Sequence, residues 1–291
     1  MSKEPRFNAM PTKLDVEIEK IDTWPTDFLE VATQNKKLIL FYHQESKRID
    51  YLCREDVVLR TRPPVNKYKN GYDTLVQSLN EVLNKYNIIG YHCTRLTPTE
   101  ISAIYREGMK VLSPDLIRSR LNSAREHGHL SQTEFEYLAN SPKIKANLHN
   151  LHGTRTGNLW FCPNRSTLKE CSAVYRLFRS WGGEAMYCGH ENDGHILGTL
   201  RTIGVPCIVK CSIPISDADQ YPPNYVERFL SYFISKDIEY PEPSAGFDMY
   251  IKRDLKVSEV LKVIDLFNPT FEALTDCKAW HEQCKIHPEQ F

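Results

Sequence analysis

Three short segments, far apart along the chain, carry the side chains most capable of chemistry. The first holds His92, the second Trp160 and the third Asp248. An imidazole can orient a hydroxyl group, an indole offers a flat face for stacking, and a carboxylate can stabilise a positive charge that develops during a reaction. Taken singly, each residue also has an ordinary explanation as a half-buried strand histidine, a core aromatic or a turn residue. Their order along the chain makes them a candidate site.

Residues 91–95 read Tyr-His-Cys-Thr-Arg and precede a helical pattern that ends in Gly-Met. They resemble the first motif of the ADP-ribosyltransferase superfamily, in the His-Tyr-Glu branch that includes poly(ADP-ribose) polymerases and diphtheria toxin. That branch has His-Gly-Ser or His-Gly-Thr, so Cys93 stands where the family usually has Gly. The resemblance implies that His92 orients the adenosine-side ribose of NAD and that the Cys93 backbone grips the carboxamide. It also places Thr94 and Arg95 among the NAD-binding residues, Arg95 as a candidate contact for the diphosphate.

A strand reading Gly-Asn-Leu-Trp-Phe-Cys, followed by a helix containing Ser-Ala-Val-Tyr, is similar to the second motif of the same family. The similarity implies that Trp160 takes the place of the first tyrosine and keeps its stacking face, with Phe161 beside it. Ser172 would then hydrogen-bond the nicotinamide carboxamide, and Tyr175 would stack on the other side of the ring. Ser166 competes with Ser172 for this role, because the match needs extra residues between the strand and the helix.

The third motif of the family is an acidic residue at the start of a late strand, and Asp248 begins the segment Asp-Met-Tyr-Ile in that position. Asp is one methylene shorter than the family's glutamate, and Glu242 and Glu184 are the alternatives. The resemblance covers about residues 88–268. It implies an α+β fold with a split, mostly antiparallel β core, flanking helices and NAD bound between two small sheets, preceded by an N-terminal α/β accessory region.

Two other groups of residues suggest competing sites. His-Gly-Thr-Arg at 152–155 copies the family triplet more literally, but no apolar strand precedes it, and Arg155 in it is a second candidate for the NAD diphosphate. Histidines and cysteines also cluster in two places, namely Cys277, His281, Cys284 and His287, and Cys188, His190 and His195. Their spacing is unlike that of zinc sites, and the terminal cluster has the period of an amphipathic helix, so we expect no metal.

Around these motifs the pattern of residues predicts the elements that position them. A strand is expected at 87–96, followed by a capping box at Thr97-Pro-Thr-Glu and a helix. Further strands are expected at Gly-Asn-Leu-Trp-Phe, Glu-Ala-Met-Tyr-Cys, Pro-Cys-Ile-Val-Lys and Phe-Asp-Met-Tyr-Ile, and helices at 114–150 and around Ser172. We divide the chain into an accessory region at 1–86 and a catalytic domain at 87–291. In the first region, strands are predicted at 37–44 and 51–60 and a helix at 73–86.

The composition is that of an ordinary globular protein, with 41% hydrophobic and 25% charged residues. Lys plus Arg equals Asp plus Glu at 37 each, so the net charge predicts no general attraction to nucleic acid or to a membrane. No stretch has the length of a membrane span, and the first residues carry no apolar signal-peptide core. We therefore expect a cytoplasmic protein without a membrane partner, in which most of the nine cysteines are free thiols.

The resemblance implies an NAD-dependent ADP-ribosyltransferase that modifies a macromolecule, with NAD as substrate. RNA or DNA is preferred over protein as acceptor, because a segment rich in Arg and His runs from Arg118 to His129. By analogy with bacterial relatives, a role as a toxin or a phage-defence effector with an antitoxin or regulatory partner is expected. The alternatives are an NAD glycohydrolase and a non-catalytic binding module on the same fold.

Overall fold

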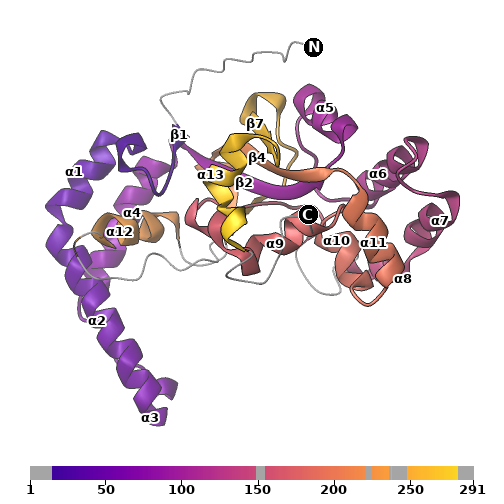
Figure 1. The fold of residues 1–291 in the computed structure, drawn as a ribbon. Coiled ribbons are helices and arrows are strands. Elements are labelled where there is room, and N and C mark those ends of the chain that lie inside the picture. Colours follow the sequence, from indigo (N-terminus) through magenta and orange to yellow (C-terminus); the bar gives the residue numbers. More distant parts are fainter. Residues whose placement is uncertain (1–14, 149–154, 221–223, 236, 238–247, 281–291) are drawn as a thin grey trace.

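The computed structural model describes residues 15–148, 155–220, 224–235, 237 and 248–280, and combines helices with two β-sheets (Figure 1). The larger sheet has the order β1-β2-β4-β7. Its strands are β1 (Asp15–Val16), β2 (Asn87–Leu96), β4 (Val205–Pro214) and β7 (Val260–Asp265). β1 is parallel to β2, and the other neighbours are antiparallel. The long central strands β2 and β4 pair along their whole length, with His92 opposite Val209.

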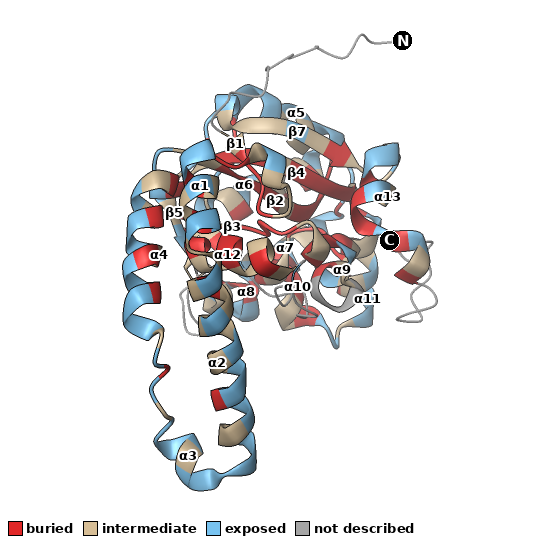
Figure 2. Ribbon diagram, turned by 90° about the vertical axis from the view of Figure 1, so that its left-hand side faces the viewer, coloured by how far each residue is buried: buried red, intermediate tan, exposed pale blue. Residues whose placement is uncertain are grey.

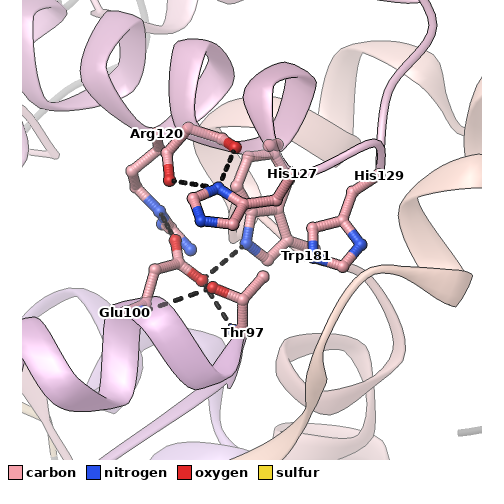
Figure 3. Close-up of a pocket in the computed structure, with 8 residues that line it drawn as sticks. Thr97, Glu100, Arg120, His127, His129 and Trp181 are labelled. Carbon is pink, nitrogen blue, oxygen red and sulfur yellow. Dashed lines mark hydrogen bonds and ion pairs between the residues drawn. The ribbon is translucent and has the colours of Figure 1, made fainter.

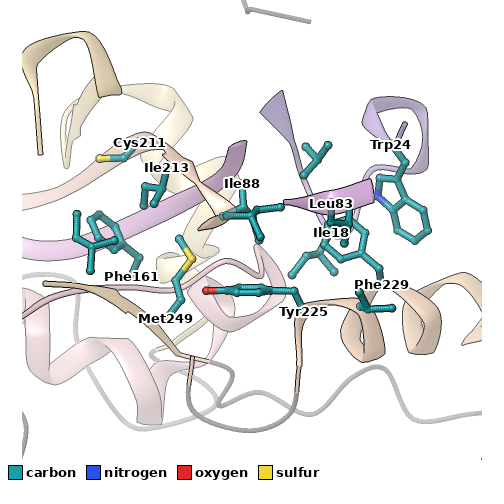
Figure 4. Packing of buried hydrophobic residues seen from close by; sticks show 14 of the residues in the cluster. Ile18, Trp24, Leu83, Ile88, Phe161, Cys211, Ile213, Tyr225, Phe229 and Met249 are labelled. Carbon is teal, nitrogen blue, oxygen red and sulfur yellow. The ribbon is translucent and has the colours of Figure 1, made fainter. Parts of the chain in front are cut away.

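The smaller sheet has the antiparallel order β3-β6-β5, from β3 (Leu159–Phe161), β6 (Met249–Ile251) and β5 (Ala218–Gln220). It joins the larger sheet at one point, where Tyr91 and Cys162 exchange two backbone hydrogen bonds of 2.9 Å. Beside this point, Gly90 gives the room for the two sheets to pack. A Cβ at position 90 would lie 2.3 Å from Cε of Met249 and 3.0 Å from Cβ of Phe161, both side chains being buried in the core shown in Figure 4.

The predicted strand at 87–96, with the helix after it, is confirmed to the residue. The hydroxyl oxygen of Thr97 accepts a hydrogen bond from the backbone N–H of Glu100, and the Glu100 carboxylate accepts one from the Thr97 N–H. This capping box begins α5 (Pro98–Glu107), and Gly108 follows its last residue with a positive φ of 80°. An added Cβ at Gly108 would lie 1.9 Å from the Leu255 carbonyl oxygen, so the close approach of the two backbones requires glycine.

The N-terminal region is helical where the sequence pattern predicted strands. Residues 37–44 and 51–60 lie in α2 (Lys36–Glu55) and α3 (Val57–Thr61), not in paired strands. The apolar run at 37–44 spans only two turns of α2, and its buried side packs on α4 (Lys69–Leu83), where the rings of Tyr42 and Tyr72 stack at 3.7 Å. The helix predicted at 73–86 is present as α4, and α1 (Thr26–Gln34) precedes α2.

One hydrophobic cluster joins the N-terminal helices to both sheets. It runs from Trp24 and Phe28 through α4 to Ile88 of β2, Met249 of β6 and α12 (Tyr225–Ser235) (Figure 4). Glu17, just after β1, is buried and binds Nζ of Lys20 at 3.0 Å and of Lys210 at 3.1 Å, while the Tyr91 hydroxyl donates to it at 3.4 Å. Residues before and after position 86 therefore share a core and a buried charge network.

Two further clusters flank the sheets. α9 (Cys171–Arg179) and α13 (Pro269–Thr275) pack on the face of β2 that carries Tyr91 and Cys93. The other cluster gathers α6 (Pro114–Glu126), α7 (Gln132–Asn140), α8 (Pro142–Leu148), α10 (Glu184–Tyr187) and α11 (Gly194–Thr202). The strand predicted at Glu-Ala-Met-Tyr-Cys is wrong, because these residues form α10, whose three apolar side chains are all buried in this cluster. Short 3-10 turns complete the chain at 21–23, 166–169, 188–190, 215–217, 257–259 and 277–279.

The architecture is α+β, as predicted, and none of the helices in the described residues is both long and apolar enough to cross a bilayer. One part projects from the rest. α2, α3 and the segment 62–68 that leads back to α4 form an arm that extends well beyond the sheets (Figures 1 and 2). Figure 2 shows that its surface is largely exposed toward the tip.

Candidate functional site

The three predicted motif segments meet where the two sheets diverge. Nδ1 of His92 lies 2.8 Å from the backbone carbonyl oxygen of Trp160, which links β2 to β3 one residue from the Tyr91–Cys162 bridge. Trp160 in turn pairs with Tyr250 of β6, the strand that Asp248 precedes. Segments 156 residues apart in the sequence, at His92 and Asp248, are thus joined through a single intervening strand.

His92 is held as a neutral imidazole with a defined tautomer. A carbonyl oxygen can only accept, so Nδ1 carries the proton and donates it to Trp160, and Nε2 is the acceptor nitrogen of the ring. Burial lowers the pKa of His92, as does the positive charge of Arg120, while the bond to the Trp160 carbonyl acts in the opposite direction. At neutral pH this ring can accept a hydrogen bond from a hydroxyl group, which is the role that its motif predicts.

Trp160 of β3 and Tyr250 of β6, which are paired across the smaller sheet, form an aromatic pair. Their ring centroids are 4.6 Å apart with an interplanar angle of 37°. Trp160 is half-buried, and its indole Nε1 is buried with no hydrogen-bond partner in the described part of the chain. Such an N–H is costly to bury without an acceptor, so a ligand acceptor or a water would stabilise it. Phe161 differs from the prediction: it is 2% exposed and belongs to the core, with its ring centroid 6.0 Å from that of His92.

Asp248 is exposed and supplies the carboxylate of the candidate site formed by His92, Trp160 and Asp248. Although the residue is exposed at the surface, neighbouring protein atoms partly desolvate its carboxylate and so raise its pKa, and the negative charge of Glu184 raises the pKa further. Glu184 begins α10 and forms an ion pair with Arg155, with Nη2 of Arg155 2.9 Å from Oε2 of Glu184. The charge of Asp248 also helps to raise the pKa of the Cys93 thiol, although the hydrogen bond from Cys93 to Cys162 and burial are the larger causes.

Thr94 and Arg95, which follow His92 in β2, are buried and contribute to the packing of the protein. Thr94 is buried in β2, 7% exposed. Arg95, predicted as a diphosphate contact, is 4% exposed, and its guanidinium donates to the carbonyl oxygens of Ile203 at 2.8 Å and Phe178 at 3.2 Å. A guanidinium with these backbone partners joins α9 and α11 to β2, so we assign Arg95 to the packing of these elements. The strand signal around His92 did not distinguish an inward-facing arginine from an exposed one.

The helix of the second motif is present, but its contacts are only partly described. α9 contains Ser172 and Tyr175, and the side chain of Ser172 lies outside the described residues. Tyr175 is half-buried against the α9–α13 cluster, with the guanidinium of Arg179 5.7 Å from its ring centroid. The competing serine, Ser166, gives its hydroxyl and its backbone N–H to the carboxylate of Glu19, which fixes the loop after β3.

A small pocket lies between α5 and α6, lined by Glu100 of α5, Arg120 of α6, His127 directly after α6, and Trp181 (Figure 3). Arg120 Nε binds the Glu100 carboxylate at 2.5 Å, and its guanidinium lies 4.8 Å from the ring centroid of Trp181. Trp181 also donates to Glu100 at 2.9 Å. Arg120, which belongs to the segment predicted to bind nucleic acid, is thus ion-paired within the protein, and its positive charge is one of the causes that lower the pKa of His92.

Several predicted alternatives fall outside the described residues, namely His152, Gly153, Thr154, Glu242, His281, Cys284 and His287. Of the second cysteine–histidine group, His190 is buried, with hydrogen-bond contacts to the Met186 carbonyl at 2.8 Å and the Ser141 hydroxyl at 3.1 Å. Among the described residues, no three His, Cys, Asp or Glu side chains lie close enough together to hold a metal ion.

The sequence patterns indicated Arg155 and Glu184 as separate candidates but not as an ion pair, and they did not indicate Tyr250, or the effect of Arg120 on His92. For Tyr250 a signal existed, because alternate residues of a strand share a face and Tyr250 is two positions after Asp248. The ion pair joins residues 29 positions apart in unrelated elements, so no local pattern could indicate it. Comparison of the chain with models of protein families, with curated proteins and with solved structures found no match.

Proposed function

We propose that the protein is an NAD-dependent ADP-ribosyltransferase that modifies a macromolecule, with His92, Trp160 and Asp248 as its central residues. The observation that carries the proposal is the meeting of three motif-bearing segments at the point where two sheets separate. The hydrogen bond from His92 to Trp160 and the pairing of Trp160 with Tyr250 support it. The α+β architecture with a split, mainly antiparallel β core agrees with the fold that the resemblance implies.

The chemistry proposed for these residues follows from their environments. The acceptor nitrogen of His92 would take a hydrogen bond from a ribose hydroxyl, and the Trp160–Tyr250 pair would support the nicotinamide ring. As the ribose–nicotinamide bond breaks, nicotinamide leaves with the bonding electron pair and the ribose becomes cationic. The carboxylate of Asp248 would stabilise this cation and accept a hydrogen bond from the attacking group.

Glu184 and Arg155 would act on Asp248 and not on the substrate. Because Glu184 is already paired with Arg155, it is the less available of the two carboxylates. Asp248 has an exposed side chain and follows the position of the family motif, so we assign the catalytic role to Asp248. Desolvation raises the pKa of Asp248 most, and the negative charge of Glu184 raises it further.

The test is to incubate the purified protein with NAD labelled on its adenylate phosphate, together with separate pools of protein, DNA and RNA. Label that becomes attached to one of the pools is the expected result. Free ADP-ribose without labelled polymer would instead identify an NAD glycohydrolase, and no turnover of NAD would favour a binding module. Either of these outcomes would reject the proposed transferase activity.

Variants connect the activity to the site. His92→Ala and Asp248→Asn should each lower the rate by about a hundredfold or more, as expected for the loss of a positioned polar group. Asp248→Glu restores the carboxylate with one more methylene and should retain measurable activity. Asp115→Asn in the first turn of α6 removes an exposed carboxylate elsewhere and is the matched control. If His92→Ala and Asp248→Asn remained fully active, the assignment of the site would be wrong.

A further inference from the structure

The arm, residues 36–68, has a charge balance unlike that of the rest of the chain. It contains eight Lys and Arg residues and four Asp and Glu residues, a net charge of +4. The remainder of the chain therefore has a net charge of −4, since the total is zero. The overall neutrality of the protein conceals a positive projection on an acidic body. A local field of this kind attracts polyanions even where the total charge does not.

Exposed apolar side chains are concentrated on the same arm. Of the nine large hydrophobic side chains that are exposed in the described part of the chain, five belong to it, namely Phe41, Tyr51, Val57, Val58 and Val65. Monomeric proteins seldom gather exposed apolar groups on one projection, and such a surface marks an interaction site. The arm is therefore a candidate surface for binding another molecule.

Aromatic rings and cations alternate along one side of α2. Lys37, Phe41, Arg48 and Tyr51 are spaced at i, i+4, i+11 and i+14, which places them on one face of the helix, and all four are exposed. Tyr51 is 64% exposed. Arg48 forms an ion pair with Glu45, in which the nitrogen and oxygen atoms are 2.8 Å apart.

The loop that returns to α4 extends this face. The ring of Phe41 stacks on that of Tyr68 with a centroid distance of 5.6 Å and an angle of 27°. Nζ of Lys67 lies 5.1 Å from the Tyr68 ring centroid, so a cation is held at the aromatic stack. Arg62 is exposed on the same loop, and neither it nor Lys37 forms an ion pair within the described residues.

We propose that the arm binds single-stranded nucleic acid, through phosphate contacts to its cations and stacking of bases on its aromatic rings. Flexible single strands are held in this way without sequence readout, because every base has a stacking face and every nucleotide a phosphate. The surface would hold a nucleic-acid acceptor, and in that respect the inference rests on the proposed function. The binding itself requires no NAD, so the two proposals fail separately.

Two observations favour the arm over the segment from Arg118 to His129. Arg120 in that segment is paired with Glu100, and Arg125 lies over the ring of Phe135 at 4.5 Å from its centroid. The arm, by contrast, presents its cations beside exposed rings. The net charge also favours nucleic acid over a protein partner, although the valines at the tip, 68% exposed at Val57 and 69% at Val58, would suit a protein.

The experiment measures fluorescence anisotropy of a labelled single-stranded RNA of about 20 nucleotides, titrated with the full chain in the absence of NAD. If about four phosphates are neutralised, the logarithm of the association constant should fall with the logarithm of the salt concentration with a slope of about −2.8. Affinity would then drop about 50-fold between about 50 and 200 mM salt. Failure to bind at the lower salt concentration, or binding that salt does not weaken, would overturn the proposal.

Two variants of equal net charge test whether the nucleic acid binds to the arm. Lys37→Glu, Arg62→Glu and Lys67→Glu together should make the salt dependence shallower by about 2 and weaken binding at low salt by at least about tenfold. Arg118→Glu, Lys143→Glu and Lys145→Glu together make the same charge change at exposed positions of α6 and α8 and should bind like the unaltered protein. Equal loss of affinity in both variants would reject the arm as the binding surface. Light scattering supplies a second test. If the unaltered protein were a dimer and only the arm variant were a monomer, the arm would be a dimer interface, and the proposal would also be rejected.

Discussion

Gly90 allows a direct test of how the two sheets are held together. In Gly90→Ala the new Cβ meets Cε of Met249 at 2.3 Å and both Cδ1 of Ile213 and Cβ of Phe161 at 3.0 Å. Overpacking of this kind costs about 1–3 kcal/mol. The smaller conformational freedom of alanine in the unfolded chain offsets about 0.5–1 kcal/mol. We therefore expect a net loss of about 1–2 kcal/mol in the free energy of unfolding, measured by urea denaturation.

A second substitution assigns this loss to the contact between the sheets. Met249→Leu removes the Cε atom with little change in volume and should by itself cost less than about 1.5 kcal/mol. In the double variant with Gly90→Ala, the worst contact is absent, so the effects should fall short of additivity by about 1 kcal/mol. Gly198→Ala, in a helix where an added Cβ meets nothing within 4 Å, should be neutral or stabilising. The packing argument would be refuted if the losses in the free energy of unfolding caused by Gly90→Ala and Met249→Leu were strictly additive. It would also be refuted if Gly90→Ala were as stable as the unaltered protein.

Two further predictions concern the site and its neighbouring helix. Glu184→Gln removes the negative charge that raises the pKa of Asp248, so that Asp248 ionises at lower pH and the acidic limb of the NAD-turnover profile moves to lower pH. A limb that stayed in place or moved to higher pH would contradict this coupling. Thr97→Ala breaks a buried capping box and should lower the free energy of unfolding by about 1–2 kcal/mol. Ser131→Ala, which breaks the exposed capping box of α7, should cost less, and thermal melts of the two variants compare them.

The parts of the fold that the sequence predicted well are those whose local signals agree. Around β2 and α5, an apolar strand, a capping box and a terminal glycine all indicate the same boundaries, and the structure has them at those residues. The run at 37–44 had no cap or turn to distinguish two helical turns from a strand. A short apolar run fits both periods, and only its contact with Tyr72 of α4 settles the matter.

The candidate site could be predicted only as a set of separate segments. Positions 92, 160 and 248 follow from motifs, but the way they meet depends on which strands pair, and pairing across more than 150 residues leaves no local trace. The role of Arg95 was missed for the same reason, since its partners are carbonyl groups of α9 and of the residue after α11. Burial of a polar side chain is decided by tertiary neighbours, not by its own strand.

The buried carboxylate of Glu17 limits how this protein can be dissected. A fragment beginning at residue 87 would leave the ammonium group of Lys210 and the hydroxyl of Tyr91 without their common acceptor. It would also uncover the backbone edge of β2 that β1 covers, a place where strands of other molecules can add. Expression of such a fragment should therefore yield aggregates, and residues 87–291 are best studied within the whole chain.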